Sequence, residues 1–447
     1  MGTPRATAPV PARWAGLVGA VLTASGAIAA ALLLARAGGW LARRCGQPSV
    51  LGEVLVGLLA VPALTAAGTR GTVDTITGPA VLGPLTLVGH AGLVLFLVAV
   101  VYELVGPRAV GSLGGGPGGS AARVVTSVAL GAAAVPCLGG LALGAVLLHS
   151  GRPDLRGDAT PAAVLFLLAA ATAVTAVPVL ARLLDERGLL RTEIGGLAMS
   201  AAVVIDSVAW LLLAVALAVA AAAAGSAVRV GVALVVLVGA AAVVRRLLRS
   251  SAVNRLAMPA RWLLPVLVGV SAYGAARGLR SAGVSEVLAA ALLGAVLPQD
   301  GARDPTGDGV DGPWHRAVGA VGRIGRWLVP VFFVAVGADA FGPGTRWPPG
   351  WLILLCLLVA TGAKALGAVA GARLAGLPAH AGLRLAVLLN CRGLTELVVL
   401  QAGREAGILT GAAYLAMLVM ALVTTAATWP VYSAVDRRLP GGVLAGR

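Results

Sequence analysis

The chain has 447 residues, of which 59% are hydrophobic and 12% are charged, and its mean hydropathy is +0.94. This composition excludes an ordinary soluble enzyme or binding domain and indicates an all-α polytopic membrane protein. The net charge of +16 would suit a nucleic-acid-binding protein, but the basic residues lie in the gaps between apolar runs and do not form one basic face. We therefore expect the lipid bilayer, and no nucleic acid, among the partners.

Long apolar runs predict about thirteen transmembrane helices, each long enough to cross the hydrocarbon core. Unbroken runs of this length exclude an outer-membrane barrel, whose strands alternate over about ten residues. We expect one integral membrane domain over residues 1–438, a short cytoplasmic tail over 439–447 and no soluble regulatory domain. In chain order the predicted helices span residues 14–36, 48–66, 84–105, 123–149, 160–184, 194–222, 228–248, 262–279, 284–298, 324–340, 350–373, 380–402 and 411–435.

The distribution of arginine indicates how these helices are oriented, because cytoplasmic loops carry an excess of basic residues. If the N-terminus lies outside, alternate loops place 22 arginines on the inner side and 10 on the outer side, and Arg392 lies within a span. An odd number of spans in the plasma membrane, with the C-terminus in the cytoplasm, therefore fits best. The four cysteines have neither a metal-binding spacing nor the pattern of a disulfide framework, and we expect no cofactor.

Few ionisable residues lie inside the predicted spans, and each is a functional candidate because a charge at the bilayer centre costs at least about 2.5 kcal/mol. They are Asp206, Lys364, Arg392, Glu396, Glu286, Glu103 and Glu53. Glu396 follows Arg392 at i,i+4 spacing and is expected to pair with it. A structural role is favoured for Glu53 and Glu103, whereas Glu286 fits a structural role and a role in proton transfer equally well.

Lys364 is the only lysine, since the other 33 of the 34 basic residues are arginine. An ammonium group differs from a guanidinium group because it can release its proton when it is buried, which suits a residue coupled to proton transport. The alternative is a lysine whose long side chain reaches the membrane surface. The position of Lys364 in the middle of a predicted span disfavours that alternative.

Asp206 also lies deep inside a long predicted helix. A buried carboxylate can bind a dehydrated Na⁺ or K⁺, and it can bind a proton in their place. Competition between these two occupants is what an exchange of cations for protons requires. The alternative is a structural aspartate that pairs with Lys364 or hydrogen-bonds across helices.

Two predicted spans contain residues that interrupt a helix. Pro178 removes the backbone hydrogen bond to Val174, which leaves carbonyl groups near Val174 and Thr175 free to coordinate an ion beside the Thr175 hydroxyl. A comparable interruption in the second half contains Asn390, Arg392 and Gly393. Discontinuous helices at corresponding positions of two halves indicate an ion site near the membrane midplane. We expect Asp206 and Thr175 to be the ligands of the monovalent cation there.

The stretch TAVPVLARLLDERGLLRTEIGGLAMSAAVVIDSVAW, at residues 175–210, resembles the signature region of the monovalent cation:proton antiporter family 2. Within that family, which includes the Kef-type transporters, the stretch is most similar to the plant cation/proton exchanger branch. Similar stretches follow in family order along nearly the whole membrane domain. They are QPSVLGEVLVGLL, GLVLFLVAVVYEL, LVPVFFVAVGAD, GAKALGAVAG, LLNCRGLTELVVL and LVMALVTTAATWPV.

The resemblance implies the sodium/proton antiporter fold, in which inverted repeats provide a core with two crossed, partly unwound helices that moves against a dimerisation subdomain. It also implies a homodimer. By the same resemblance, Asp206 is the ion-binding aspartate and Lys364 is the lysine of the helix packed against it. The unwound crossings are then Thr175 to Pro178 and Asn390 to Gly393.

One position departs from the family pattern. The residue before the ion-binding aspartate is usually Asp or Asn, and here it is Ile205. In members with two aspartates, the first is thought to pair with the lysine. Here Lys364 would pair with Asp206, or with a distant acid such as Glu286, or would spend time without its proton. Plant members also carry a large soluble tail and Kef-type members a nucleotide-binding domain, and we expect neither.

The predicted function is secondary active exchange of a monovalent cation, Na⁺ or K⁺, against protons, by alternating access at Asp206 and without enzymatic chemistry. Oxygen ligands suit several cations, so the sequence does not discriminate between them. The alternative is a channel or carrier of the same fold that moves another small solute without proton coupling. A membrane-embedded enzyme is disfavoured, because the chain has no HExxH motif and no paired aspartates at protease spacing.

Overall fold

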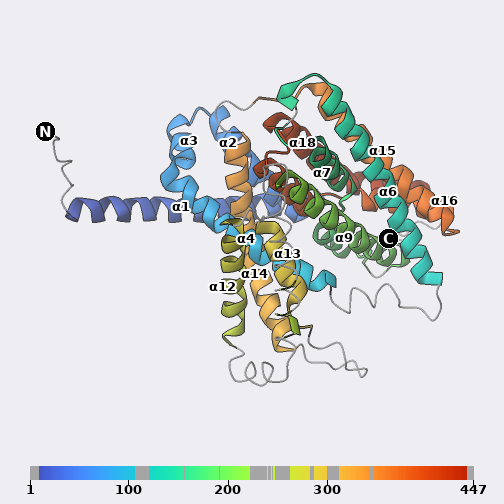
Figure 1. Ribbon diagram of the computed structural model, residues 1–447, viewed down its shortest axis with the longest axis horizontal. Coiled ribbons are helices and arrows are strands. Elements are labelled where there is room, and N and C mark those ends of the chain that lie inside the picture. The colour runs from blue at the N-terminus through green and yellow to red at the C-terminus, as the bar shows by residue number, and fades with distance from the viewer. Residues whose placement is uncertain are drawn as a thin grey trace.

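The computed structural model describes residues 10–105, 120–155, 157–190, 192–221, 262–281, 286–299, 312–341 and 346–439, together with a few separate positions between 239 and 246. Within these residues the long elements are all α-helices and no strand occurs (Figure 1). This confirms the predicted all-α fold class. Among the described helices, eight are long and apolar enough to cross a membrane. The predicted span 228–248 lies outside the described residues, apart from those separate positions.

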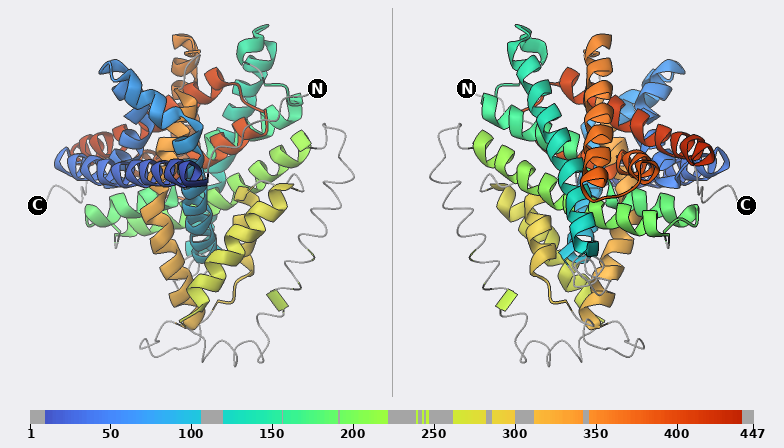
Figure 2. Two further views of the ribbon diagram at one scale, coloured as in Figure 1. Left: turned by 90° about the vertical axis from the view of Figure 1, so that its left-hand side faces the viewer. Right: turned by 90° about the vertical axis from the view of Figure 1, so that its right-hand side faces the viewer.

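One set of helices packs mainly within itself, and we call it the scaffold group. α14 lies along α4 and α2, α1 contacts α2 and α4, and both α12 and α13 pack on α4. In Figures 1 and 2, α12 and α14 extend to the lower end of the molecule. The members are α1 (Val10–Arg44), α2 (Ser49–Ala66), α3 (Arg70–Thr77), α4 (Pro79–Val105), α12 (Leu264–Ser281), α13 (Glu286–Val296) and α14 (Pro313–Ala340).

A second set surrounds two broken helices, and we call it the crossing group. α6 packs along α15 and α7, and α7 also packs against α9. Each half contains a long helix, two short helices separated by a break, and another long helix. The first half is α6 (Ser120–His149), the short η1 (Pro153–Leu155), α7 (Pro161–Ala173), α8 (Val177–Glu186) and α9 (Glu193–Ala221). The second half is α15 (Gly350–Leu374), α16 (Ala379–Leu389), α17 (Leu394–Glu405) and α18 (Gly411–Arg438).

The scaffold and crossing groups are in contact, but each packs more extensively within itself than against the other. α18 of the crossing group packs against α2 of the scaffold group. Next to this contact, the side-chain amide of Gln47 donates from Nε2 to the carbonyl of Ala426 at 3.1 Å. Elsewhere, His90 Nε2 on α4 lies 3.5 Å from Glu405 Oε1 on α17. Apolar packing also crosses the boundary, because one hydrophobic cluster contains Leu58 of α2 and Leu415 of α18.

Several predicted helix limits differ from the structure. α1, for example, covers Val10–Arg44 where the span 14–36 was predicted. The predicted spans 160–184 and 380–402 are each divided into two short helices, as the interruptions within them suggested. The predicted span 324–340 was too short, because α14 begins at Pro313. Hydropathy ends a span at its first charged residues, but backbone hydrogen bonds continue the helix past them into the polar region.

Close packing of α6 on α15 explains part of the high glycine content. A Cβ atom on Gly131 would collide with the carbonyl oxygen of Gly367, and one on Gly367 would collide with that of Gly131. Small residues allow this approach between helices in lipid, where packing is the main source of helix association. Lys364 lies about one helical turn before Gly367 on α15, so this contact also sets the position of the lysine.

Candidate functional site at the helix crossing

The two broken helices meet inside the crossing group. Residues 174–176 separate α7 from α8, and residues 390–393 separate α16 from α17. The N–H of Ala176 donates to the carbonyl of Cys391 at 3.1 Å, which joins the two extended segments directly. Both predicted interruptions are therefore present, and tertiary packing brings them together.

The two breaks have different causes. Pro178 is the second residue of α8, and because it has no N–H it leaves the carbonyl of Val174 without a helical partner. The second break contains no proline, but Gly393 lies close against α8. A Cβ atom at Gly393 would come within 2.7 Å of Cγ2 of Val179, so only glycine permits this contact.

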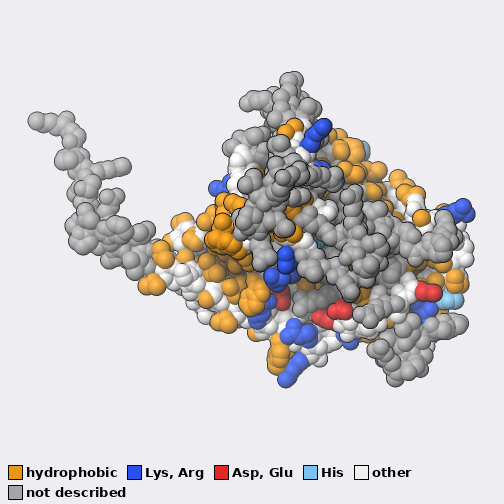
Figure 3. All heavy atoms as spheres, turned by 90° about the horizontal axis from the view of Figure 1, so that it is seen from below, with side chains coloured by type: hydrophobic (Ala, Val, Ile, Leu, Met, Phe, Trp, Pro, Cys, Tyr) orange, Lys and Arg blue, Asp and Glu red, His pale blue; other side chains and the backbone are white. Residues whose placement is uncertain are grey.

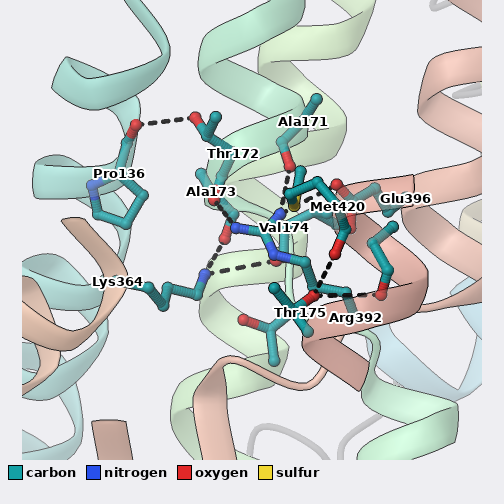
Figure 4. A network of polar contacts seen from close by, with 12 residues as sticks. Pro136, Ala171, Thr172, Ala173, Val174, Thr175, Lys364, Arg392, Glu396 and Met420 are labelled. Carbon is teal, nitrogen blue, oxygen red and sulfur yellow. Dashed lines mark hydrogen bonds and ion pairs between the residues drawn. The ribbon is translucent and has the colours of Figure 1, made fainter. Parts of the chain in front are cut away.

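Arg392 caps the C-terminus of α7. Its guanidinium group donates from Nη1 to the carbonyl of Ala171 and from Nη2 to that of Thr172, both at 2.7 Å (Figure 4). Carbonyl groups at a helix C-terminus lack intrahelical partners and carry partial negative charge, so a cation stabilises this end. Nη1 of Arg392 also lies 3.1 Å from Oε1 of Glu396, and both side chains are fully buried. The predicted i,i+4 pair is therefore formed.

Lys364 caps the same helix end from α15. Its buried ammonium group donates to the carbonyl of Ala173 and to that of Val174, the latter at 3.4 Å (Figure 4). The expectation that the Val174 carbonyl is free for an ion is therefore wrong for this conformation. Pro178 does release that carbonyl from the helix, and the lysine then occupies it.

Thr175 and Asn390 provide further oxygens at the crossing. The buried Thr175 hydroxyl donates to the carbonyl of Leu389 at 3.0 Å, which leaves its oxygen lone pairs as its remaining capacity for a cation. Oδ1 of Asn390 is buried and has no hydrogen-bond partner. Asn390 is the residue at which α16 ends, so its side chain lies beside the second break.

Sequence reasoning did not single out Thr425, a buried residue of α18 that holds the second break. Its hydroxyl accepts the N–H of Arg392 at 3.2 Å and lies 2.7 Å from the carbonyl oxygen of the same residue. The stretch that contains Thr425 belongs to the family resemblance, but a threonine in an apolar helix has no local signal for this role. Only the packing of α18 on α17 reveals it.

Asp206 lies on α9, is fully buried and carries the carboxylate predicted to bind the ion. Neither of its oxygens has a hydrogen-bond partner. Within the described part of the chain, no ion pair joins it to Lys364, although that lysine is the cation that acts on it electrostatically. The expected direct pairing of Lys364 with Asp206 is therefore not formed in this conformation.

Ile205 precedes Asp206 and is also fully buried. It belongs to an apolar cluster that includes Ala202, Leu385 and Leu389, from α9 and α16. A side chain in this position supplies packing and no polar group. At this position the chain therefore has hydrocarbon where the family resemblance led us to expect an acid or an amide.

Glu286 is not part of the crossing. It begins α13 in the scaffold group, is 7% exposed, and its Oε1 lies 3.6 Å from Nη1 of Arg277 on α12. The suggested pairing of Lys364 with Glu286 is therefore contradicted by the placement of both residues. Glu53 likewise lies in the scaffold group, where its Oε1 is 3.5 Å from Nη1 of Arg36.

A narrow cavity reaches the second break from the scaffold group. Its lining includes Val50 and Val54 of α2, together with Arg392, Gly393 and Thr425. Its volume of about 10 Å³ has room for about one water molecule. The crossing is therefore nearly closed on this side in the present conformation.

Comparison with known families gives one match that covers most of the chain. The model of the family described as "Sodium/hydrogen exchanger, transmembrane" matches residues 27–432. The matched segment contains both helix breaks, Asp206 and Lys364.

Several curated antiporters are similar to this chain. Cation/H(+) antiporter 17 of Arabidopsis thaliana is 28% identical over 416 residues, which cover 90% of this chain and 47% of that protein. The Na(+)/H(+) antiporter NhaS4 of Synechocystis sp. is 26% identical, with 89% of this chain and 93% of that protein covered. The Na(+)/H(+)-K(+) antiporter GerN of Bacillus cereus is 26% identical, with 90% and 94% covered. The chain thus spans about half the length of the plant protein and nearly all of the two bacterial ones.

Among solved structures, the sodium proton antiporter MjNhaP1 of Methanocaldococcus jannaschii superposes with a TM-score of 0.51. The superposition covers 94% of this chain and 97% of that one, at 15% sequence identity. At this identity the likeness concerns the fold alone, and it confirms the predicted antiporter fold with its two discontinuous helices.

Proposed function

The chain belongs to the transmembrane sodium/hydrogen exchanger family, and from this premise we propose that it is a secondary active antiporter that exchanges Na⁺ or K⁺ for protons at Asp206. The observation that carries the proposal is the state of this carboxylate. It is fully buried, and both of its oxygens are without a hydrogen-bond partner. A buried carboxylate in this state is stabilised by taking up a cation or a proton.

The charges around the crossing support competition between these two occupants. Arg392 and Glu396 are joined in a buried ion pair and compensate each other. Among the described residues, Lys364 and Asp206 are the other buried ionisable side chains at the crossing, and the backbone carbonyls of α7 hold the lysine in place. A cation or a proton on Asp206 neutralises its carboxylate, and a second positive charge there would have no counter-charge, so occupation by both at once is unfavourable.

Alternating access follows from the division into two helix groups. The crossing group carries both breaks, Asp206 and Lys364, and it shares less packing with the scaffold group than it has within itself. We infer that it moves relative to the scaffold group and opens Asp206 to each side in turn. A site with an occupied carboxylate is nearly neutral and crosses readily, whereas an empty charged site does not.

Because residue 205 is isoleucine and not a second acid, we favour the exchange of one cation for one proton. With a single carboxylate at the site, each cation displaces one proton, and exchange is electroneutral. If Lys364 also released its proton, two protons would move per cation and exchange would carry charge. Solid-supported membrane electrophysiology distinguishes the two schemes. We expect no transport-coupled transient current after a jump in cation concentration, and a transient current that Lys364→Arg abolishes would establish the second scheme instead.

The proposed function is tested by proton flux in proteoliposomes with an imposed pH gradient. Na⁺, K⁺ and Li⁺ are added in turn to wild type, to Asp206→Asn and to Asp185→Asn, which makes the same substitution at an exposed position of α8. We expect at least one cation to dissipate the gradient in wild type and in the Asp185 variant, and we expect this response to disappear in Asp206→Asn.

The same assay contains the outcome that contradicts antiport. Cation flux without proton counterflow would indicate a channel or a carrier for another solute, in which Ile205 marks the loss of proton coupling. A response that persists in Asp206→Asn would place the coupling carboxylate elsewhere. We further propose a homodimer in the plasma membrane, with the N-terminus outside and the C-terminus in the cytoplasm, on the basis of the family and of the arginine distribution.

A further inference from the structure

A groove of about 550 Å³ lies between the scaffold and crossing groups. Its walls come from α1, α2, α4 and α14 of the scaffold group and from Val179 on α8 of the crossing group. This volume lies within the range of small-molecule binding sites. Asp206 does not line the groove, whereas Val50 and Val179 line both this groove and the narrow cavity at the second break.

The groove is positively charged. Arg36, Arg323 and Arg326 line it, and Glu53 is the one acidic residue in its lining. Glu53 lies beside Arg36, with Oε1 and Nη1 3.5 Å apart. Arg323 and Arg326 are exposed, and neither forms an ion pair with an acidic residue in the described ranges. A surplus of positive charge repels Na⁺ and K⁺ and attracts an anion.

Apolar and aromatic side chains form the rest of the lining. Phe96 and Phe333 are buried in its wall, while Trp327 is 60% exposed at its edge. The Cζ atom of Arg36 lies 3.8 Å from the centre of the Trp327 ring. Tryptophan and arginine side chains of this kind are typical of the level at which a membrane protein meets lipid head groups. Seen from below, basic side chains gather near the middle of the molecule among hydrophobic ones (Figure 3).

We propose that this groove binds the phosphate group of an anionic phospholipid. Guanidinium groups bind phosphate through paired N–H donors, and three arginines line this groove. Basic pockets between membrane helices are suited to acidic head groups. Free inorganic phosphate has the same charge chemistry, but it makes no use of the apolar wall formed by Phe96 and Phe333. The combination of both kinds of wall therefore favours the lipid.

The bound lipid contacts both helix groups. Val179 of α8 lines the groove and also packs against Gly393 at the second break, whereas the arginines belong to α1 and α14. The lipid therefore restrains the movement of one group against the other. This regulatory consequence rests on the proposed exchange function, but the binding itself does not.

Native mass spectrometry of the detergent-solubilised full chain tests the binding. Phosphatidylglycerol, phosphatidylcholine and inorganic phosphate are titrated onto wild type, onto Arg323→Gln/Arg326→Gln and onto Arg437→Gln/Arg438→Gln. The last variant removes the same charge from exposed positions at the end of α18. We expect wild type to prefer phosphatidylglycerol. Two lost arginine contacts should weaken that binding about tenfold or more in the groove variant, with less than about a twofold change in the control.

Fluorescence provides a second readout that does not depend on the arginine variants. Phosphatidylglycerol brominated near the head group should quench Trp327, and Trp327→Phe should lose this part of the quenching. Equal losses of binding in the two arginine variants, or the absence of quenching at Trp327, would overturn the groove assignment. If inorganic phosphate displaced phosphatidylglycerol at the same concentration at which the lipid saturates the groove, the ligand would be a soluble anion and the proposal of a lipid would be overturned. All of these readouts report binding, so failure of antiport would not affect them.

Discussion

Among the four buried ionisable residues at the crossing, three are committed to partners and one is not. Arg392 bonds two carbonyls of α7 and Glu396, and Lys364 bonds the next two carbonyls. Asp206 has no hydrogen-bond partner. The backbone of α7 thus holds the Lys364 ammonium group, so its charge acts on Asp206 without a contact that blocks the carboxylate. This division of roles supports Asp206 as the residue that binds the transported ions.

At the residue scale, we predict that Lys364→Met lowers stability more than Arg373→Met, which removes an exposed basic residue from the last turn of the same helix. Loss of Lys364 leaves the carbonyls of Ala173 and Val174 buried without a donor, at a cost of about 1–3 kcal/mol. Thermal unfolding in detergent measures the difference. Equal midpoints for the two variants would show that the lysine does not stabilise the end of α7.

At the element scale, contacts between helix backbones position the site. α6 and α15 touch at Gly131 and Gly367, and α8 touches the second break at Gly393. At Gly131 and Gly367 glycine allows two backbones to approach, which is the usual means of close helix packing in lipid, whereas Gly393 makes room for the side chain of Val179. Because α15 carries Lys364 and α17 follows Arg392, these contacts align both caps with the end of α7.

We predict that Gly367→Ala destabilises the protein, whereas Gly362→Ala on the same helix does not. The new methyl group at Gly367 collides with the carbonyl oxygen of Gly131, and such overpacking costs about 1–3 kcal/mol. Nothing lies within 4 Å of the corresponding position at Gly362, where alanine can stabilise the helix by up to about 1 kcal/mol. Unfolding midpoints and cation-driven proton flux should fall together in the first variant only. Similar behaviour of the two variants would contradict the proposed backbone contact.

At the scale of the whole molecule, the division into scaffold and crossing groups gives the proposed movement a testable geometry. His90 on α4 and Glu405 on α17 lie on opposite sides of the boundary, with Nε2 and Oε1 3.5 Å apart. Arg277 and Glu286 are at a similar separation, 3.6 Å, but both belong to the scaffold group. The two pairs therefore provide matched positions for a cross-link between the groups and for one within a group.

We predict that a short bis-methanethiosulfonate cross-link between cysteines at positions 90 and 405 stops exchange, because it prevents movement of one group against the other. The same reagent applied to the variant with cysteines at 277 and 286 should leave its rate of proton flux nearly the same as before linking. Both variants are made without the exposed thiol of Cys45. Proton flux is measured before linking, after linking and after release with a reductant. Full activity in the linked 90–405 variant would exclude movement at this boundary.

Local chemistry made several features of this protein predictable from the sequence. The absence of an N–H on Pro178 removes one helical hydrogen bond in any fold, although prolines such as Pro136 and Pro330 lie inside continuous helices here. The i,i+4 spacing likewise favours the pair of Arg392 and Glu396. The apolar composition indicates a membrane protein. The single lysine and the aspartate inside predicted spans are recognisable because a charge inside the bilayer costs free energy. Each of these features depends on a few neighbouring residues, so a linear pattern is sufficient to reveal it.

The tertiary structure decided which distant groups meet. In the folded chain the Lys364 ammonium group donates to carbonyls of α7 and does not pair with Asp206. Glu286 lies beside Arg277. The tertiary structure also gathered arginines of α1 and α14 into one groove. These choices join residues far apart in the chain, and they follow from which helix faces pack against each other. Hydropathy identifies a buried helix, but it does not specify the neighbour that each face will contact.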